Sequence, residues 1–279
     1  MLKQLKLILL FIGVTYCAVY PFLNTQSQKP TTEASEQLVE IKVAENTTQA
    51  TEVDLVEVEY ASEHLPDFSK YTDVKQKKRA FFGYLAPLVR QINREMLNYR
   101  TFVDSLESAP ISEKEQNTFL KIANKFHIDT DQSFESIRAQ MLLRVDALPV
   151  ELVLMQAANE SGWGTSRFAL VANNLFGQWC FKPGCGVVPT GRPAGEKYEV
   201  RQFAHPIDSI RSYYNNLNTG HAYAELRNIR LQLRQARASL NPSKIAEGLL
   251  AYSIRREAYI EEIQTMIRIN TKYIPEVNG

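Results

Sequence analysis

The strongest constraint on the fold is an apolar stretch between Pro149 and Gly162 with the periodicity of a helix. Pro149 suits a first helical turn, where its missing N–H would have no partner. Gly162 suits the residue after a helix, because glycine adopts a left-handed backbone without a Cβ clash. The apolar side chains between them recur at helical spacing: Val150, Val153, Leu154, Ala157 and Ala158. The pattern predicts a helix whose apolar face packs in a core.

Glu160 falls in the last turn of this helix, on the same face as Gln156. The negative end of the helix dipole disfavours a carboxylate there, and Trp163 and Phe168 offer apolar walls, so we expect a raised pKa. A carboxyl group of this kind can donate a proton near neutral pH, as a glycosidase acid must. An ion pair with Arg167 is an equally good structural alternative, since ion-pair networks also perturb pKa values.

Other helices are predicted on both sides of this one. Residues 74–108 carry a long helical pattern interrupted at Pro87, and Ser112 with Glu115 forms a capping box before the next apolar face. Residues 134–145 form a third pattern that leads into the Glu160 helix. The fold class is therefore mainly α.

Strand character is confined to residues 179–202, where glycine and proline break any helix. The segments GVVPT (186–190) and EKYEVRQF (196–203) have the composition of two short strands joined by a loop. They predict a small β-hairpin lobe and make the whole an α+β protein.

Cys180 and Cys185 lie at the entry to this lobe. In an exported protein, two cysteines this close most simply form a local disulfide. A nucleophilic cysteine assisted by His205 or His221 would instead indicate a cysteine peptidase, but the close second cysteine argues against it. A zinc site is disfavoured because the histidines lack the spacing of finger ligands.

The N-terminus predicts export. Lys3 and Lys6 precede an apolar run from Leu7 to about Leu23, and no small-x-small cleavage site follows, so residues 1–23 are predicted to be a signal anchor. Cys17 raises the alternative of a lipoprotein, which the preceding tyrosine disfavours.

Residues 24–64 are predicted to be a disordered acidic tether, because they are rich in Thr, Gln, Ser and Glu. The remaining body, from residue 64 onward, holds 28 Lys and Arg against 22 Asp and Glu. A cationic body suits an anionic polymer, although ordinary solvated helix faces explain the charge equally well.

The run AANESGWGTSRFALVANNLFG (157–177) resembles the signature of bacterial cell-wall glucosaminidases, glycoside hydrolase family 73. The segments VRQFAHPIDSIRSYYNNLNTGHAYAELR and LLAYSIRREAYIEEI extend the resemblance, which covers roughly residues 131–270. More narrowly, LPDFSKYTDVKQKKRAFFGYLAPLV and CFKPGC are similar to the Bax-type branch of that family. The resemblance implies a lysozyme-like catalytic domain over 131–279, preceded by a helical extension over 65–130.

The family resemblance implies that Glu160 is the catalytic acid and that Tyr223 lines the cleft beside it. Packing at the start of a helix is the structural alternative for Tyr223. Family members commonly carry a second glutamate on the first strand of the lobe, where this chain has none. Glu196 and Glu199 on the second strand are candidate substitutes, and each can equally be an exposed strand charge. The N-acetyl group of the substrate is a further candidate for this role.

Four residues are candidates for substrate contacts: Gln156, Asn174, Phe176 and Trp179. Each has a structural alternative. Gln156 can fill its helix face or bond the glutamate, Asn174 can satisfy backbone groups in its turn, and Phe176 can anchor that turn to the core. Trp179 suits stacking on a sugar ring or burial in the lobe.

The resemblance therefore implies a hydrolase of the bacterial cell envelope that cleaves the β-1,4 bond on the N-acetylglucosamine side of peptidoglycan glycan strands. The alternatives are muramidase or lytic transglycosylase action, and a glycan-binding scaffold without catalysis. No cofactor or metal is expected, and the only further partner is the membrane, through the anchor. The chain lacks a nucleotide-binding glycine loop and a basic, aromatic-interleaved surface, so nucleic acid is not expected.

Overall fold

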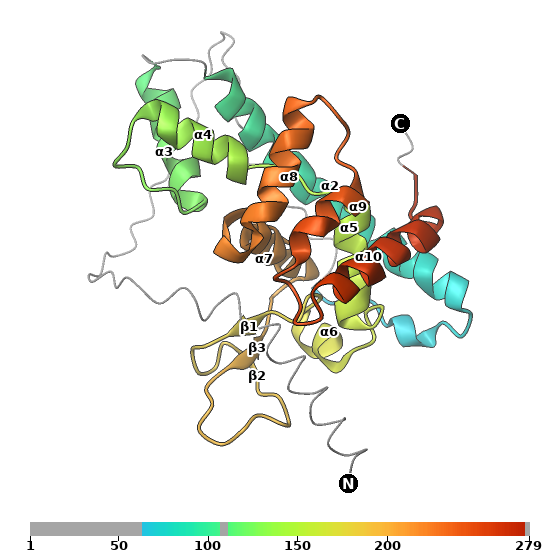
Figure 1. The fold of residues 1–279 in the computed structure, drawn as a ribbon. Coiled ribbons are helices and arrows are strands. Elements are labelled where there is room, and N and C mark those ends of the chain that lie inside the picture. Colours follow the sequence, from blue (N-terminus) through green and yellow to red (C-terminus); the bar gives the residue numbers. More distant parts are fainter. Residues whose placement is uncertain (1–62, 107–110, 277–279) are drawn as a thin grey trace, which may run out of the picture.

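The computed structural model describes residues 63–106 and 111–276, which form a helical body with a small sheet at one edge (Figure 1). In chain order the elements are η1 (Phe68–Lys70), α2 (Val74–Ser105), α3 (Glu113–Lys125), α4 (Phe134–Arg144), α5 (Val150–Ser161), α6 (Arg167–Ala172), β1 (Trp179–Cys180), β2 (Gly186–Val187), β3 (Glu199–Arg201), α7 (Pro206–Thr219), η2 (His221–Tyr223), α8 (Ala224–Gln235), α9 (Pro242–Ala246), η3 (Glu247–Leu249), α10 (Glu257–Asn270) and η4 (Thr271–Tyr273). The predicted fold class is confirmed.

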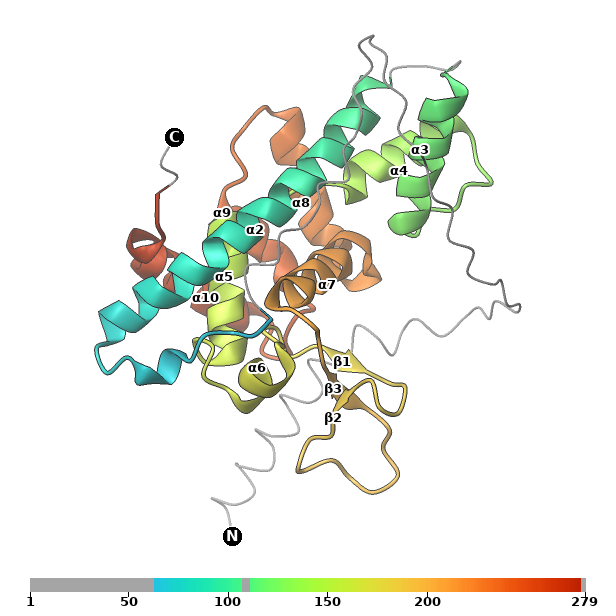
Figure 2. The ribbon, with the colours of Figure 1, turned by 180° about the vertical axis from the view of Figure 1, so that it is seen from behind.

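Helix α2 is the longest element and runs along one side of the body, against α4, α5 and α7 (Figure 2). It begins where the side chain of Asp73 accepts a hydrogen bond from the backbone N–H of Gln76 at 2.7 Å. Its apolar face is buried over its whole length, from Phe81 to Val103. Pro87 lies inside the helix, so the one long helix that the pattern over residues 74–108 predicts is present.

Helix α5 lies in the middle of the body, in contact with α2, α9 and α10. Its apolar side chains are buried as the periodicity predicts, and it ends at Gly162, whose φ of 58° is left-handed. The backbone N–H of Gly162 donates to the carbonyl of Ala158, which closes the last turn. The helix therefore ends two residues after Glu160, which places Glu160 in its last turn.

Helices α3 and α4 also begin as the sequence predicts. The Ser112 side chain accepts from the N–H of Glu115 at 3.3 Å, and the Glu115 carboxylate accepts from the N–H of Ser112 at 2.8 Å, so the capping box is present. Helix α4 packs against α2 and α8, at the end of the molecule away from the sheet (Figure 1).

A buried ion cluster lies between α4 and α5. The carboxylate of Asp146 lies 2.8 Å from Arg234, 3.4 Å from Arg100 and 3.8 Å from Arg230. Arg100 belongs to α2, and the other two arginines belong to α8. Burial lowers the pKa of Arg230 from 12.5 to about 10, while Asp146 raises it. The cluster ties three elements together at a single carboxylate.

The β-lobe, residues 179–201, contains three strands in the order β1-β3-β2, all antiparallel. The two predicted strands correspond to β2 and β3, and β1 is an additional strand that pairs Trp179 with Val200. The strands are short, so backbone hydrogen bonds alone hold little of the lobe together. The lobe lies beside α6 (Figure 1).

The predicted signal anchor (1–23) and nearly all of the predicted tether (24–64) lie outside the described residues. Within the described ranges, no helix has both the length and the apolar content needed to cross a bilayer. Side chains of α2 and of the helices after residue 131 share one apolar core. The division at residue 130 stays a prediction.

Candidate active site

Glu160 is half-buried in the last turn of α5 and is held by a tyrosine from α10. The hydroxyl of Tyr259 donates to Glu160 Oε1 at 2.9 Å. Among the described residues no ion pair to Glu160 is formed. Arg167, the predicted partner in the structural alternative, donates instead to Thr190 Oγ1 at 3.0 Å.

Two further buried residues extend this contact into a chain of hydrogen bonds. Gln156 Nε2 donates to the Tyr259 hydroxyl at 3.0 Å, and the Tyr213 hydroxyl donates to Gln156 Oε1. Gln156 and Glu160 are one turn apart on α5, so both face α10. The chain Tyr213–Gln156–Tyr259–Glu160 therefore connects α7, α5 and α10. We call it the tyrosine chain.

Burial raises the pKa of Glu160 from 4.5 to about 7. Hydrogen bonds from Tyr259 and Asn159 oppose this shift, because they stabilise the charged form. Glu262 raises the pKa and Arg255 lowers it, and these two residues form an ion pair with each other at 2.6 Å. The surroundings thus hold a proton on Glu160 up to neutral pH.

The aromatic contact found at the Glu160 carboxyl group is a tyrosine, and the apolar walls expected from Trp163 and Phe168 stay a prediction. Trp163 packs against Phe81 and Phe82 of α2, with ring centroids 5.7 and 5.3 Å away. At the carboxyl group, the aromatic contact is Tyr259, on whose ring Tyr252 stacks at 5.3 Å.

Tyr223 is buried at the end of η2, and its ring centroid lies 6.1 Å from that of Tyr252. It therefore belongs to the same aromatic cluster as Tyr259, which it joins through Tyr252. Its predicted place lining the cleft stays a prediction.

The turn after α6 is held by two buried asparagines. Asn174 Nδ2 donates to the carbonyls of Gln178 and Arg201, each at 2.8 Å, and its Oδ1 accepts from the N–H groups of Phe176 and Gln178. Asn174 thus satisfies backbone groups on both sides of the turn. Phe176 is buried, and its ring stacks on that of Tyr213 with the ring centroids 4.1 Å apart. The turn therefore also contacts the tyrosine chain.

Asn173 joins three segments at the same turn. It has a left-handed φ of 51° and ends α6. Its Nδ2 donates to the carbonyls of Glu63, Phe203 and Ala204, and its Oδ1 accepts from the N–H of Leu65 at 3.3 Å. The N-terminal edge of the described fold is therefore bound to the turn beside the lobe.

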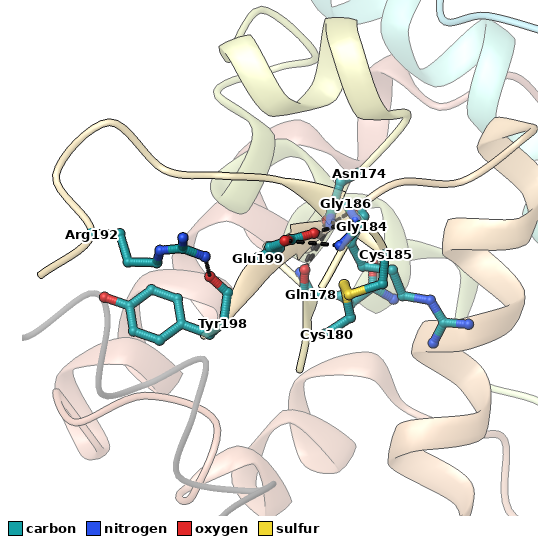
Figure 3. Close-up of a disulfide and its surroundings, with 10 residues drawn as sticks. Asn174, Gln178, Cys180, Gly184, Cys185, Gly186, Arg192, Tyr198 and Glu199 are labelled. Atoms are coloured by element: carbon teal, nitrogen blue, oxygen red, sulfur yellow. Dashed lines mark hydrogen bonds between the residues drawn. A yellow bond between two sulfur atoms is a disulfide. The ribbon is translucent and has the colours of Figure 1, made fainter. Parts of the chain in front are cut away.

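A disulfide joins Cys180, at the end of β1, to Cys185, just before β2 (Figure 3). It links the two outer strands of the sheet across the central strand β3. The bond takes up both thiols, so neither is left as a nucleophile or a thiolate ligand, although the sulfurs and the Glu199 carboxylate lie within 4.8 Å of one another.

The Glu199 carboxylate points at this disulfide loop (Figure 3) and accepts from the N–H groups of Gly184 at 3.0 Å and Gly186 at 2.9 Å. The bond from Gly184 is the largest cause that lowers its pKa. A side chain at Gly186 would place its Cβ 2.0 Å from the Val200 carbonyl oxygen, so only glycine fits there. Glu196, in contrast, is exposed on the loop before β3.

Trp179 lies half-buried in β1. Its ring and that of Tyr198 form a T-shaped pair, with the ring centroids 4.6 Å apart. Its indole Nε1 is buried and has no hydrogen-bond partner within residues 63–106 and 111–276. Of the four candidates for substrate contact, Trp179 is the one with a partly exposed ring, whereas Gln156, Asn174 and Phe176 are buried. The substrate contacts themselves stay predictions.

The sequence did not single out Tyr259, Tyr213 or Tyr252. Tyr252 and Tyr259 are seven residues apart in the segment that resembles the closing helices of the family. Tyr252 lies in the turn before α10 and Tyr259 in the first turn of that helix, so helical periodicity does not relate the two residues. Nothing local indicated that Tyr259 meets a residue 99 positions earlier.

Comparison with known proteins agrees with this geometry. Residues 136–272 match the family described as mannosyl-glycoprotein endo-beta-N-acetylglucosaminidase. This match identifies a glucosaminidase domain, which is a glycan-cleaving hydrolase domain. The chain is also 32% identical over 215 residues to "Protein bax" of Escherichia coli (strain K12), which covers 76% of this chain and 77% of that protein. It belongs to the Bax-type branch of the glucosaminidase family. No solved structure gives a significant match.

Proposed function

We propose that the protein hydrolyses the β-1,4 bond on the N-acetylglucosamine side of peptidoglycan glycan strands, with Glu160 as general acid. The observation that carries this proposal is the half-buried carboxyl of Glu160, whose pKa burial raises to about 7. An acid with a pKa near the working pH is protonated often enough to donate and acidic enough to do so quickly. The glucosaminidase match supports the substrate class.

The second catalytic role is assigned here to the substrate. Glu199 accepts two backbone hydrogen bonds inside the lobe, and Glu196 is exposed on a loop. We propose that the N-acetyl group of the bound sugar stabilises the oxocarbenium-like centre, a substrate-assisted route that needs only one protein acid. Replacing Glu196 or Glu199 with Gln then leaves the chemical step close to its parental rate.

Product analysis tests the bond that is cut. Purified full-length protein is incubated with isolated sacculi, and the masses of the released muropeptides are measured by mass spectrometry. Reducing N-acetylglucosamine ends are expected. Reducing N-acetylmuramic acid ends would instead show a muramidase, and 1,6-anhydro ends would show a lytic transglycosylase.

Substitution tests the acid. Glu160→Gln is expected to lower wall digestion at least about 100-fold, the lower end of what a positioned general acid contributes. Glu196→Gln and Glu199→Gln serve as matched controls. Unchanged digestion by Glu160→Gln would remove Glu160 from the mechanism. If the parent protein binds sacculi but releases nothing, the alternative of a glycan-binding scaffold replaces the enzyme.

We also propose that residues 1–23 anchor the protein in the inner membrane, with the glucosaminidase domain in the periplasm. The Cys180–Cys185 disulfide supports an oxidising compartment. The protein is expected to stay with membranes after alkaline carbonate extraction and to be cut by protease added to spheroplasts. Release by carbonate would exclude the anchor, and protection from protease would exclude the orientation.

A further inference from the structure

We propose that Tyr213 and Gln156 are positioning residues that set the direction of the tyrosine chain and thereby place the acidic proton of Glu160 on Oε2. This proposal rests on the proposed role of Glu160 as the acid and adds which oxygen carries its proton. Neither Tyr213 nor Gln156 touches the reacting carboxyl group. They act through Tyr259, which does.

The direction of the chain follows from its buried end. The Tyr213 side chain is about 1% exposed, and among the described residues its hydroxyl has one hydrogen-bond partner, Gln156 Oε1. Burial raises the pKa of Tyr213 well above its ordinary value, so the hydroxyl keeps its hydrogen. A buried hydroxyl hydrogen without an acceptor is costly, and the Gln156 oxygen is the acceptor within reach. Tyr213 must therefore donate.

Each later step has one solution. With Oε1 of Gln156 turned to Tyr213, its amide Nε2 faces Tyr259 and can only donate, because an amide NH₂ has no acceptor lone pair to offer. The Tyr259 hydroxyl accepts that bond, and its own hydrogen then points to Glu160 Oε1. Oε1 is thus an acceptor. When the carboxyl group is protonated, the hydrogen belongs on Oε2, the oxygen not bonded to Tyr259.

The opposite direction is the alternative that Tyr213 excludes. A flipped Gln156 amide would donate to Tyr213 and accept from Tyr259, and Glu160 would then carry its proton on Oε1, bonded to Tyr259. That proton would be hydrogen-bonded to Tyr259 and therefore not free to move to a substrate oxygen. The flipped arrangement leaves the Tyr213 hydrogen without an acceptor. Packing also opposes rearrangement, because Phe176 stacks on Tyr213 and Tyr252 stacks on Tyr259.

The adjacent residue provides a matched control. Tyr214 is as buried as Tyr213, but its hydroxyl donates to Asn93 Oδ1 at 2.7 Å, on the side of α2. Tyr214→Phe therefore removes one buried hydroxyl, as Tyr213→Phe does, without altering the tyrosine chain. A purely structural role for Tyr213 predicts the same result for both variants.

The experiment compares Tyr213→Phe, Tyr214→Phe and the parent as full-length proteins, by the pH dependence of muropeptide release. We expect Tyr213→Phe to lower kcat roughly 10- to 100-fold with KM retained, a part of the factor that general-acid catalysis supplies. Its alkaline limb should move to higher pH, because Tyr259 no longer always donates to the carboxylate. Tyr214→Phe should keep the parental kcat and alkaline limb. Parental kinetics in Tyr213→Phe, or the same change in both variants, would overturn the proposal.

Two further measurements keep the result interpretable. If Tyr213→Phe does not fold, Gln156→Met provides a second test: it removes the amide oxygen that could accept from Tyr259, so Tyr259 keeps donating to Glu160 and the parental alkaline limb is expected, whereas a moved limb would overturn the proposal. The Glu160 carboxyl band, assigned in the infrared spectrum by its loss in Glu160→Gln, reports titration without any activity. If Glu160→Gln still digests sacculi, the proposed function fails, and this band decides the inference alone. A shift of its titration in Tyr213→Phe supports the chain, and an unshifted titration overturns it.

Discussion

Asp146 and Glu160 lie near opposite ends of α5, and the protein surrounds these two carboxyl groups in opposite ways. Three arginines surround Asp146, two of them from α8 and one from α2. Glu160 has no ion pair among the described residues and is bonded instead by the neutral hydroxyl of Tyr259. Cations next to a buried carboxylate hold elements together, whereas burial without a cation leaves a proton available for chemistry.

The largest expected effect on stability comes from removing Asp146, the carboxylate that three arginines surround. Asp146→Ala leaves the buried guanidinium of Arg230 without its counter-charge, so we expect a loss of about 3–5 kcal/mol in the free energy of unfolding. Urea denaturation measures it. Asp104→Ala is the control, because its ion pair with Arg138 at 3.7 Å is exposed and should change the free energy by less than about 1 kcal/mol. Equal losses of unfolding free energy in the two variants would show that the arginines around Asp146 stabilise the fold no more than an exposed ion pair does.

Glu160→Gln is expected to raise the free energy of unfolding, whereas Asp146→Ala lowers it. The pKa of Glu160 is raised from 4.5 to about 7, so between these values the unfolded chain releases a proton that the folded protein keeps. Folding stability therefore falls as pH rises through this window, and the neutral Gln avoids that loss. We expect Glu160→Gln to be more stable than the parent by about 3 kcal/mol at pH 8, fading towards pH 4.5. Urea denaturation at both pH values tests this, and a pH-independent difference would contradict it.

Glu199 is an intermediate case, because backbone N–H groups hold its carboxylate in place of cations or tyrosine. Glu199→Gln replaces one acceptor oxygen by an amide that cannot accept. We expect faster hydrogen exchange at the amides of Gly184 and Gly186, with the exchange of α5 unchanged. Mass spectrometry of peptic fragments resolves the two regions. Faster exchange in α5 as well would show that the lobe and the helical core unfold together.

The smallest expected effect comes from replacing Arg255, a charged neighbour of Glu160. Arg255 lowers the pKa of Glu160, but it is 54% exposed and paired with Glu262. Solvent screens a charge in such a position. Arg255→Gln should therefore move the alkaline limb of activity to higher pH by less than about one unit, because one pKa unit already equals 1.36 kcal/mol of interaction. A shift to lower pH would mean that Glu160 does not limit activity on the alkaline side.

Local rules were sufficient where a residue's role depends on its near neighbours in sequence. Gly162 ends α5 and Ser112 with Glu115 caps α3 as predicted, because these effects act within one helical turn. The raised pKa of Glu160 was also predictable in direction, since a helix end and burial both favour it.

The rest depends on contacts between distant segments. Tyr259 and Tyr213 reach α5 from α10 and α7, and strand β1 exists only through its pairing with β3. Arg230 lies on a helix whose sequence is largely polar, yet it is fully buried because the Asp146 carboxylate lies 3.8 Å from it and the backbone carbonyls of Leu143 and Arg144 accept its hydrogens. Periodicity places a side chain on a face, but it does not say which residue of another element it meets.

The bonds of Asn173 determine where mechanical tension would enter this protein. A force applied along residues 1–62 reaches the described fold at Glu63 and Leu65, and both are held by the Asn173 side chain. The same side chain holds Phe203 and Ala204, which connect β3 to α7. A pull on the N-terminus is therefore delivered first to the turn beside the β-lobe. The four hydrogen bonds of this side chain resist the pull together with the packing of Leu65, which belongs to the apolar core.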